Sequence, residues 1–274
     1  MVNFLILCGV AVGSGAAAES HRRVAPRVLL TALSTWAVLG GRSLEREVAL
    51  VGGQLDSGHL DLARVQLTHL VGRDTSQLDE TEIVRATLES LAENTSDAVV
   101  APLVWGALAG LPGLLGYRAA NTLDAMVGHR SPRHRRFGWA AARLDDVLNL
   151  PGSRLTAALT VAIGPEPREA WRAWRRDAHR HPSPNAGPFE AAFAGALGVR
   201  LGGTNDYAGR VEHRAVMGRG ASVARGDLDR ARRLARRVGG SAALLAAGYC
   251  WAREYRPSYV PGQRPAHGLA ATGY

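Results

Sequence analysis

Three carboxylates recur at four-residue intervals in one segment of the chain, at Glu89, Glu93 and Asp97. In a helix this spacing places the side chains on one face, one turn apart. Like charges at this spacing repel by roughly 0.2–0.5 kcal/mol per pair in an exposed helix, so the stripe favours cations. Mg²⁺ prefers carboxylate oxygens and commonly carries substrate phosphates. The stripe therefore indicates either a solvated acidic face or a site for a metal-bound phosphate.

The helix that carries this stripe is expected to begin after Asp79. Asp79 and Glu82 form a variant of the capping box, in which each side chain accepts a hydrogen bond from the backbone of the other. This structural role explains Glu82 but none of the stripe. Directly after Asp97, the segment from Ala98 to Tyr117 contains no charge, and its length approaches the roughly 20 residues that cross a membrane.

A second polar block, from Tyr117 to Asn149, repeats the theme of oxygen ligands at helical spacing. Asn121 precedes Asp124 by three residues, and Asp145 and Asp146 precede Asn149 by four and three. Arginines between these positions suit polyphosphate, anionic lipid or the flank of a membrane helix: Arg130, Arg133, Arg135 and Arg136.

The third polar block is HPSPNAG, from His181 to Gly187. Its backbone amides and Asn185 could hold an anion, although turn chemistry alone also explains it. The sequence contains no Walker-type glycine loop, Gly-x-Ser-x-Gly elbow, His-Glu-x-x-His motif or cysteine cluster. Any ATP site must therefore be unconventional.

Composition narrows the class of protein. The chain has 274 residues and a formal charge of +9, and all 33 basic residues are arginine, which indicates a GC-rich genome. The arginines are scattered among apolar runs and aromatic residues make up 6%, which disfavours nucleic acid binding. Cys8 and Cys250 lie near opposite ends, so neither a disulfide framework nor a zinc site is indicated.

The periodicity predicts an all-α, polytopic integral membrane protein with amphipathic helices and a candidate re-entrant segment. No strand alternation persists. Candidate membrane or buried helices are residues 2–18, 24–41, 98–117, 155–163 and 239–251. Candidate amphipathic or small-residue helices are residues 45–70 (broken at 56–58), 168–181, 189–201 and 225–237. A soluble helical protein is the alternative, because the mean hydropathy is only −0.07.

The two charged blocks constrain the topology. If residues 98–117 crossed the membrane, the arginine-rich second block would lie inside and the acidic first block outside. One active site could not then contain both. Prolines and glycines in this segment favour a bend, so Glu93 and Asp145 are expected on the same side of the membrane.

Three long strings, taken in order, resemble the CobD/CbiB family of cobalamin biosynthesis proteins, the adenosylcobinamide-phosphate synthases. The strings are GRDTSQLDETEIVRATLESLAENTSDAVVAPL, GYRAANTLDAMVGHRSPRHRRFGWAAARLDDVLN and RRDAHRHPSPNAGPFEAAFAGALGVRLGG. The resemblance spans roughly Trp36 to Tyr207. It implies an integral membrane enzyme that joins aminopropanol, or its O-phosphate, to a propionate of adenosylcobyric acid. It also implies that ATP and Mg²⁺ activate the carboxylate, as an acyl phosphate that the amine attacks.

With this resemblance, the polar residues of the three blocks acquire expected roles. The expected catalytic residues are Glu89, Glu93, Asp97, Asp145 and Asp146, and all of these except Glu89 are expected metal ligands. The expected phosphate- and ligand-binding residues are Arg85, Asn94, Asn121, Asp124, Arg130, Arg143 and Asn185. The expected partners are the corrinoid, the amine and membrane lipid, in a multi-pass bacterial membrane protein.

One helical membrane domain is expected over residues 1–255, with a family-like core over 36–207 and a disordered tail over 256–274. The family's Gly-Asp-Pro and His-Pro elements do not occur ahead of Trp36, so residues 1–35 are expected to be an atypical, shortened N-terminus. Two other functions stay open: a magnesium-dependent membrane prenyltransferase, faintly suggested by NTLD, and a non-enzymatic corrinoid-binding or transport accessory protein.

Overall fold

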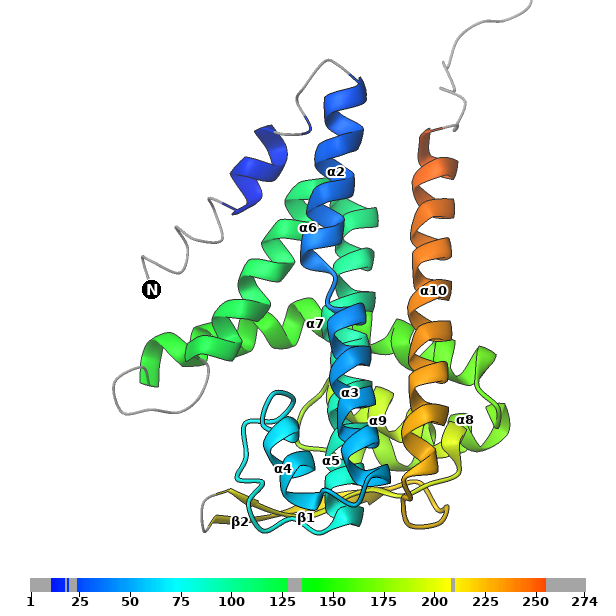
Figure 1. Cartoon of the computed structure of the whole chain (residues 1–274). Coiled ribbons are helices and arrows are strands. Elements are labelled where there is room, and N and C mark those ends of the chain that lie inside the picture. Colours follow the sequence, from blue (N-terminus) through cyan, green and yellow to red (C-terminus); the bar gives the residue numbers. More distant parts are fainter. Residues whose placement is uncertain (1–10, 18, 20–23, 128–134, 208–209, 255–274) are drawn as a thin grey trace, which may run out of the picture.

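The computed structural model describes residues 11–17, 19, 24–127, 135–207 and 210–254 (Figure 1). Most of this part of the chain is helical, as predicted. The elements are α2 (Val24–Val38), α3 (Gly41–Asp56), α4 (Leu60–Leu67), α5 (Glu80–Thr95), η1 (Ser96–Val100), α6 (Ala101–Val127), α7 (Arg135–Ile163), α8 (Pro167–Asp177), η2 (Ala178–Arg180), α9 (Ala186–Leu197), β1 (Leu201–Tyr207), β2 (Arg210–Met217) and α10 (Gly226–Glu254). Arg130 and the tail over 256–274 lie outside the described residues.

Helices α5 and α9 form the centre of the core. Helix α9 is buried on almost every side, and its small residues allow neighbouring helices to approach closely. A Cβ at Gly195 would lie 2.4 Å from the carbonyl oxygen of Glu169 on α8. The predicted capping box starts α5: Asp79 Oδ1 accepts from the amide of Glu82 at 2.8 Å, and Glu82 Oε2 accepts from the amide of Asp79 at 3.0 Å.

The apolar segment after Asp97 turns back on itself, as the predicted bend requires. Helix α6 is broken at Ala109 and Gly110, where Gly110 has φ 64° and ψ −154°. The hydroxyl of Tyr117 then donates to the backbone carbonyl of Asp97 at 3.0 Å. In a continuous helix these two residues would be about 30 Å apart. The segment is therefore a helical hairpin whose tip is Gly110.

Charged side chains from both ends of the chain hold the tip of this hairpin. Glu19 Oε1 accepts from the amide of Leu111, the first residue after the break, at 2.8 Å. Arg253, near the end of α10, donates to the carbonyl of Leu108 at 3.3 Å. Each side chain satisfies a backbone group that the broken helix leaves without its usual partner.

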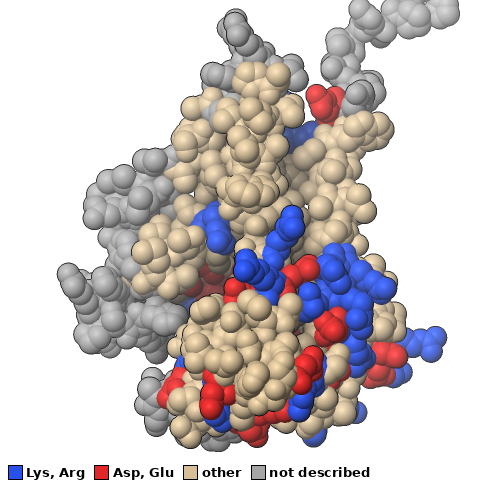
Figure 2. All heavy atoms as spheres, in the orientation of Figure 1, with Lys and Arg blue, Asp and Glu red and all other residues tan. Residues whose placement is uncertain are grey.

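Helices α2, α6 and α10 each contain a stretch without charged residues, and the three stretches begin near the same height in Figure 1. A Cβ at Gly41 of α3 or at Gly239 of α10 would lie 3.2 or 3.1 Å from Val99, just above Asp97. Beyond this level, residues 28–40, 98–109 and 239–252 carry no charge. The upper ends of α2, α6 and α10 project from the rest of the molecule (Figure 1), and Figure 2 shows an upper part almost free of charge above a band of arginines and acids.

An antiparallel β-hairpin corrects the expectation of an entirely helical chain without strands. Strand β1 pairs with β2 in the register Leu201↔Met217 and Gly203↔Arg214. The predicted helix over 189–201 instead ends at Gly198, which has the left-handed conformation. Gly202 and Gly203 also have positive φ angles, of 81° and 103°, which only glycine adopts readily. These glycines end the helix and start the strand.

Candidate functional site

The acidic stripe lies on one face of α5 and η1, as predicted, and connects two polar clusters. Asp97 belongs to a carboxylate cluster between η1, α6 and α7, whereas Glu89 belongs to a glutamate cluster between α5, α9 and β1. Glu93 lies between them, because it acts electrostatically on Asp97 and also on Glu190 of α9. The stripe thus joins residues that are distant in the sequence into one polar region.

The carboxylate cluster consists of Asp97, Asp124 and Asp145, with their amide and hydroxyl neighbours. Asp124 and Asp145 both lie within electrostatic range of the Asp97 carboxylate. The structure thus brings together acids from the first and second polar blocks, which the hairpin makes possible. Oxygen ligands of this kind are those that Mg²⁺ prefers.

Hydrogen bonds fix Asp145 within this cluster. Asn121 donates to one of its carboxylate oxygens at 3.2 Å, and Asn149 donates to the other at 2.8 Å. Tyr117 donates to Asn149 Oδ1 at 2.6 Å, which orients the Asn149 amide toward Asp145. Because Tyr117 also lies 3.0 Å from the carbonyl of Asp97, one tyrosine ties η1, α6 and α7 together.

A π-helical turn, η1, places Asp97 at the cluster. Such turns interrupt the regular hydrogen bonding of an α-helix and occur often at functional sites. The carbonyl of Ala98, within this turn, accepts from the amide of Gly40 at 3.0 Å. Asp97 Oδ1 is buried and has no hydrogen-bond partner among the residues that the structure describes, as expected of an oxygen available to a cation.

Burial raises the pKa of Asp145 from 3.8 to about 6, and the hydrogen bonds from Asn121 and Asn149 only partly offset this, while Asp124 and Asp146 raise it further. Its native pKa therefore exceeds the unfolded value. Between pH about 4 and 6 the unfolded chain binds fewer protons than the native chain, so stability falls as pH rises through this window.

We therefore expect the wild-type protein, free of divalent cations, to lose on the order of 2–3 kcal/mol of stability between pH 4 and pH 6 through this residue. Thermal unfolding in detergent with a chelator measures this loss. The difference between wild type and Asp145→Asn should grow across the window and stay constant above it. A difference independent of pH would contradict the assignment.

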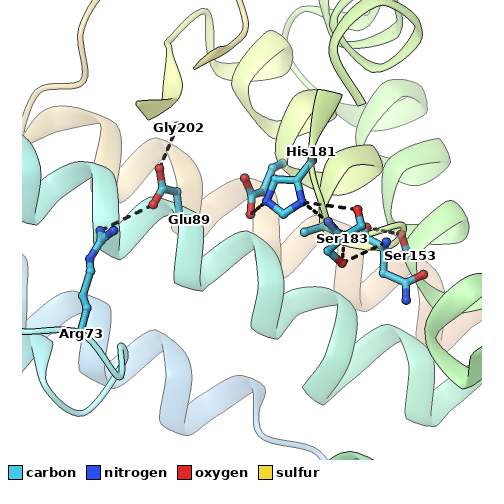
Figure 3. Close-up of polar contacts among 9 residues, drawn as sticks. Arg73, Glu89, Ser153, His181, Ser183 and Gly202 are labelled. Carbon is cyan, nitrogen blue, oxygen red and sulfur yellow. Dashed lines mark hydrogen bonds and ion pairs between the residues drawn. The ribbon is translucent and has the colours of Figure 1, made fainter. Parts of the chain in front are cut away.

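The glutamate cluster contains an arginine, a histidine and buried acids from four parts of the chain (Figure 3). Arg73 lies 3.6 Å from Glu89, whose other carboxylate oxygen accepts from the amide of Gly202 at 2.8 Å. His181 Nε2 lies 3.8 Å from Glu190 Oε1, and both side chains are only 5% exposed. The pair places a proton-accepting group and a carboxylate together inside the protein.

Several predicted site residues lie outside both clusters. Asp146, whose side chain is 34% exposed, forms an ion pair with Arg143 at 3.8 Å; it acts on Asp145 but is not among the acids that act on Asp97. Asn94 donates to the carbonyl of Ser90 one turn earlier at 2.9 Å. Arg85 lies beside β1, because a Cβ at Gly203 would be 3.0 Å from its guanidinium.

Asn185 joins elements and does not face the carboxylates. Its side chain donates to the backbone carbonyl of Asp146 at 2.7 Å and accepts from Arg154 at 2.8 Å. Its backbone carbonyl accepts from Ser153 at 2.6 Å. The third polar block therefore fastens the start of α9 to α7, which indirectly positions both clusters.

The sequence predicted no site role for Tyr117, Arg73, His181 or Glu190, whereas it did predict Asn149 as an oxygen ligand beside Asp145. Glu190 carried a usable signal, since it is the single charge in the otherwise apolar segment of α9. A buried acid needs a partner or a function. Tyr117, Arg73 and His181 carried no such signal, because their roles depend on contacts with distant residues.

The side chains that could act as metal ligands show which kind of metal site is feasible here. Among the described residues, no three His, Cys, Asp or Glu side chains already stand together as a metal site. Mg²⁺ commonly uses one or two carboxylates and completes its shell with water and phosphate. Asp97 and Asp145 satisfy that smaller requirement.

An apolar cavity of about 320 Å³ adjoins the carboxylate cluster. Its lining includes Trp105 and Tyr117 of α6 and Leu144 and Leu148 of α7. Trp105 donates to the carbonyl of Leu148 at 2.8 Å, which fixes the two helices at this point. Tyr117 thus has an apolar surface on one side and the carboxylates on the other.

A family model described as CobD/Cbib protein matches residues 1–235. The protein named Cobalamin biosynthesis protein CobD of Mycobacterium tuberculosis (strain CDC 1551 / Oshkosh) is 54% identical over 223 residues, covering 80% of this chain and 71% of that protein. Proteins of the same name are 51% identical over 186 residues in Rhodobacter capsulatus (68% of this chain, 59% of that protein) and 44% over 223 residues in Geobacter metallireducens (78% and 70%). No solved structure matches.

The chain therefore belongs to the CobD/Cbib family, as the three strings predicted, and its relatives place it in cobalamin biosynthesis. The match over residues 1–235 is wider than the predicted core over 36–207.

Proposed function

We propose that the chain joins aminopropanol, or its O-phosphate, to a propionate of adenosylcobyric acid in an ATP-dependent reaction that forms an amide bond. The observation that carries this proposal is the convergence of Asp97 and Asp145 beside a second cluster built around Glu190. A ligation of this type needs a site for the activating phosphate and a site that prepares the amine.

The carboxylate cluster is the proposed phosphate site. Asp97 and Asp145 would supply oxygens for Mg²⁺, and Asn121 and Asn149 hold Asp145 in place. When bound, the cation would neutralise phosphate charge while the corrinoid carboxylate becomes an acyl phosphate. Glu93 is not needed as a ligand and lies toward the glutamate cluster.

The uncharged stretches of α2, α6 and α10, which lie below the tip held by Glu19 and Arg253, are the proposed membrane-embedded part. By length and composition, one helix among the described residues, Glu80–Met126, could cross a membrane, but its hairpin at Gly110 returns the chain to the starting side. Each uncharged stretch is about 20 Å long, and many of their side chains are exposed, including Leu33, Trp36 and Leu244.

The band of arginines below these stretches suits the cytoplasmic membrane surface. Both clusters then lie at that surface.

Cysteine labelling tests this placement. In a variant with Cys8 and Cys250 replaced by serine, we expect Asp61→Cys and Arg143→Cys to react with an impermeant maleimide from the same side of sealed vesicles. Asp61 precedes the hairpin and Arg143 follows it, and their side chains are 92% and 66% exposed. Reaction from opposite sides would show that the α6 segment crosses the membrane.

Turnover by the purified chain in lipid vesicles tests the function itself. The reaction contains adenosylcobyric acid, aminopropanol O-phosphate, ATP and Mg²⁺, and mass spectrometry detects the amide product. Corrinoid retention without product would instead indicate an accessory binding protein. Transfer of a prenyl group from a diphosphate would indicate a prenyltransferase.

A further inference from the structure

A polar pocket lies at the tip of the α6 hairpin, separated from Asp97 by the uncharged residues 98–109. Its volume is about 360 Å³. Two residues of the tip and three charged residues from distant parts of the chain line it: Ala109, Gly110, Glu19, Arg27 and Arg253. The proposed ligation does not use this pocket.

Positive charge exceeds negative charge in this lining. Arginine stays protonated in proteins, so Arg27 and Arg253 outweigh the one glutamate and the formal charge is +1. Glu19 is engaged with the tip itself, because its Oε1 accepts from the amide of Leu111 at 2.8 Å. In the part of the chain that the structure describes, neither arginine forms an ion pair with an acid. Glu254 follows Arg253 on α10 but does not line the pocket.

The two arginines keep donors available for a ligand. Arg253 Nη1 donates to the carbonyl of Leu108 at 3.3 Å, which is long for an N–H···O bond. A guanidinium has five N–H donors in a planar fork that matches the oxygens of phosphate. Arg27 lines the same pocket from α2, so two guanidinium groups on different helices can contact one anion.

The pocket lies where all three uncharged stretches end. Arg27, Gly110 and Arg253 directly adjoin the upper ends of these stretches, and the start of α2 and the end of α10 lie at the top of Figure 1. Each stretch is about 20 Å long, whereas the hydrocarbon core of a bilayer is about 30 Å thick. With the arginine band at one membrane surface, the pocket lies roughly 10 Å short of the opposite headgroups. A bilayer adapts to charges at this depth by thinning locally, which brings headgroups to them.

Exposed aromatic side chains mark the same level of α10. Tyr249 and Trp251 precede Arg253 within about one turn and are 47% and 65% exposed. Tyr and Trp are enriched where a membrane meets water, at the level of the headgroups. Leu244 and Leu245, further down the helix, are 76% and 53% exposed. The surface of α10 thus changes from apolar through aromatic to charged, as at a membrane interface.

We propose that this pocket binds the phosphate group of an anionic membrane phospholipid between Arg27 and Arg253. The diester phosphate of such a lipid carries one negative charge, which matches the formal charge of +1 in the lining. A zwitterionic headgroup brings a cation of its own and matches less well. The exposed leucines of α2 and α10 below the pocket receive the acyl chains. The inference rests on the membrane placement in the proposed function and does not depend on the ligation chemistry.

A lipid bound in this way braces the hairpin. Its phosphate connects α2 to α10 across the tip and offsets the repulsion between Arg27 and Arg253. A ligand that binds the folded chain and not the unfolded chain raises the stability of the folded state. The lipid should therefore change thermal unfolding as well as being retained.

Lipid binding to the purified full chain tests the site. Native mass spectrometry counts retained lipids as phosphatidylglycerol or phosphatidylcholine, with identical acyl chains, is titrated into detergent micelles. We expect the wild type to bind phosphatidylglycerol roughly tenfold more tightly, and this lipid to raise the midpoint of thermal unfolding more. The double variant Arg27→Gln with Arg253→Gln should lose both effects. Arg27→Gln alone, which keeps the contact of Arg253 with Leu108, should lower the preference about threefold.

The matched control removes the same charge far from the tip. It is Arg168→Gln with Arg172→Gln, two exposed arginines on α8, and it should keep the lipid preference. An equal loss in this control would show a general effect of charge and overturn the site. Equal affinity of the wild type for the two lipids would overturn it without any variant. Displacement of phosphatidylglycerol by inorganic phosphate, with equal stabilisation, would identify a free-phosphate site and overturn the lipid assignment.

Failure of this site and failure of the proposed function give different results. A lipid preference that depends on the two arginines, with no amide formed in the turnover assay, would support the lipid site and reject the ligation. Turnover together with an unaltered lipid preference in the double variant would reject the lipid site and support the ligation. The cysteine-labelling experiment reports on the membrane placement separately, since neither of its positions lines the pocket.

Discussion

Asp145→Asn is expected to lower kcat/KM for amide formation about a thousandfold while the protein stays folded. The variant removes one of the charges that hold the cation and keeps the size of the side chain. Asn121 and Asn149 both donate to Asp145, so one donor would face an amide group and lose its acceptor. The cost in stability is about 1–2 kcal/mol, partly offset because a buried charge is removed.

Initial rates over a range of Mg²⁺ concentrations measure this effect, and thermal unfolding confirms that the variant is folded. The matched control is Asp229→Asn on α10, whose exposed side chain pairs with Arg232 at 2.8 Å and should leave rates unchanged. Activity within tenfold of the wild type in Asp145→Asn would show that the carboxylate cluster is not the phosphate site.

Asp146, the acid next to Asp145, provides a second test of the carboxylate cluster. The sequence predicted the same role for Asp145 and Asp146, since either has suitable spacing to Asn149. Successive residues of a helix differ by about 100° in direction, and only tertiary packing decides which one faces the cluster. The structure pairs the half-buried Asp146 with Arg143 and does not place it among the acids that act on Asp97, so we expect Asp146→Asn to lower kcat/KM less than threefold.

The sequence predicted the local features of α5 correctly, because these features depend only on residues within a few positions of one another in the same helix. The capping box at Asp79 and the stripe of Glu89, Glu93 and Asp97 both follow from the helical period alone. The bend in the apolar segment was also predictable, because the distribution of charge made a straight crossing inconsistent with one shared site. In that case a long-range conclusion followed from electrostatics.

The remaining features depend on contacts that no local pattern contains. His181 and Glu190 are nine residues apart, but their meeting depends on the turn at Ser183 and on the packing of α9. The β-hairpin was missed because its first strand begins with Gly202 and Gly203, residues that usually weaken strands. Both features belong to the glutamate cluster, which is why the sequence located the carboxylate cluster more completely.

Gly110→Ala is expected to destabilise the protein by about 2–4 kcal/mol and to abolish most of its activity. Gly110 has φ 64° and ψ −154°, a conformation that a residue with a Cβ adopts only at a cost of about 1–3 kcal/mol. A Cβ would also overlap the Glu19 carboxylate that caps Leu111. The Glu19 carboxylate can move away, with loss of its hydrogen bond to Leu111, whereas the backbone strain is relieved only by a change of φ and ψ at the tip of the hairpin.

Opening of the hairpin would disturb the carboxylate cluster directly. The Tyr117 hydroxyl lies beside Asp97 and orients Asn149 only because the second half of α6 returns to its starting level. A shift at Gly110 would therefore separate Asp97 from Asp145, although neither residue is altered.

Thermal unfolding and turnover in nanodiscs measure the two effects in Gly110→Ala. The matched control is Gly53→Ala on α3, where no atom lies within 4 Å of the added Cβ and the higher helix propensity of alanine should stabilise by up to about 1 kcal/mol. Wild-type stability in Gly110→Ala would mean that the turn lies elsewhere in the segment. Lost stability with full activity would mean that the reaction does not need Asp97 and Asp145 together, because the hairpin is what brings the acidic stripe and the second polar block to one place.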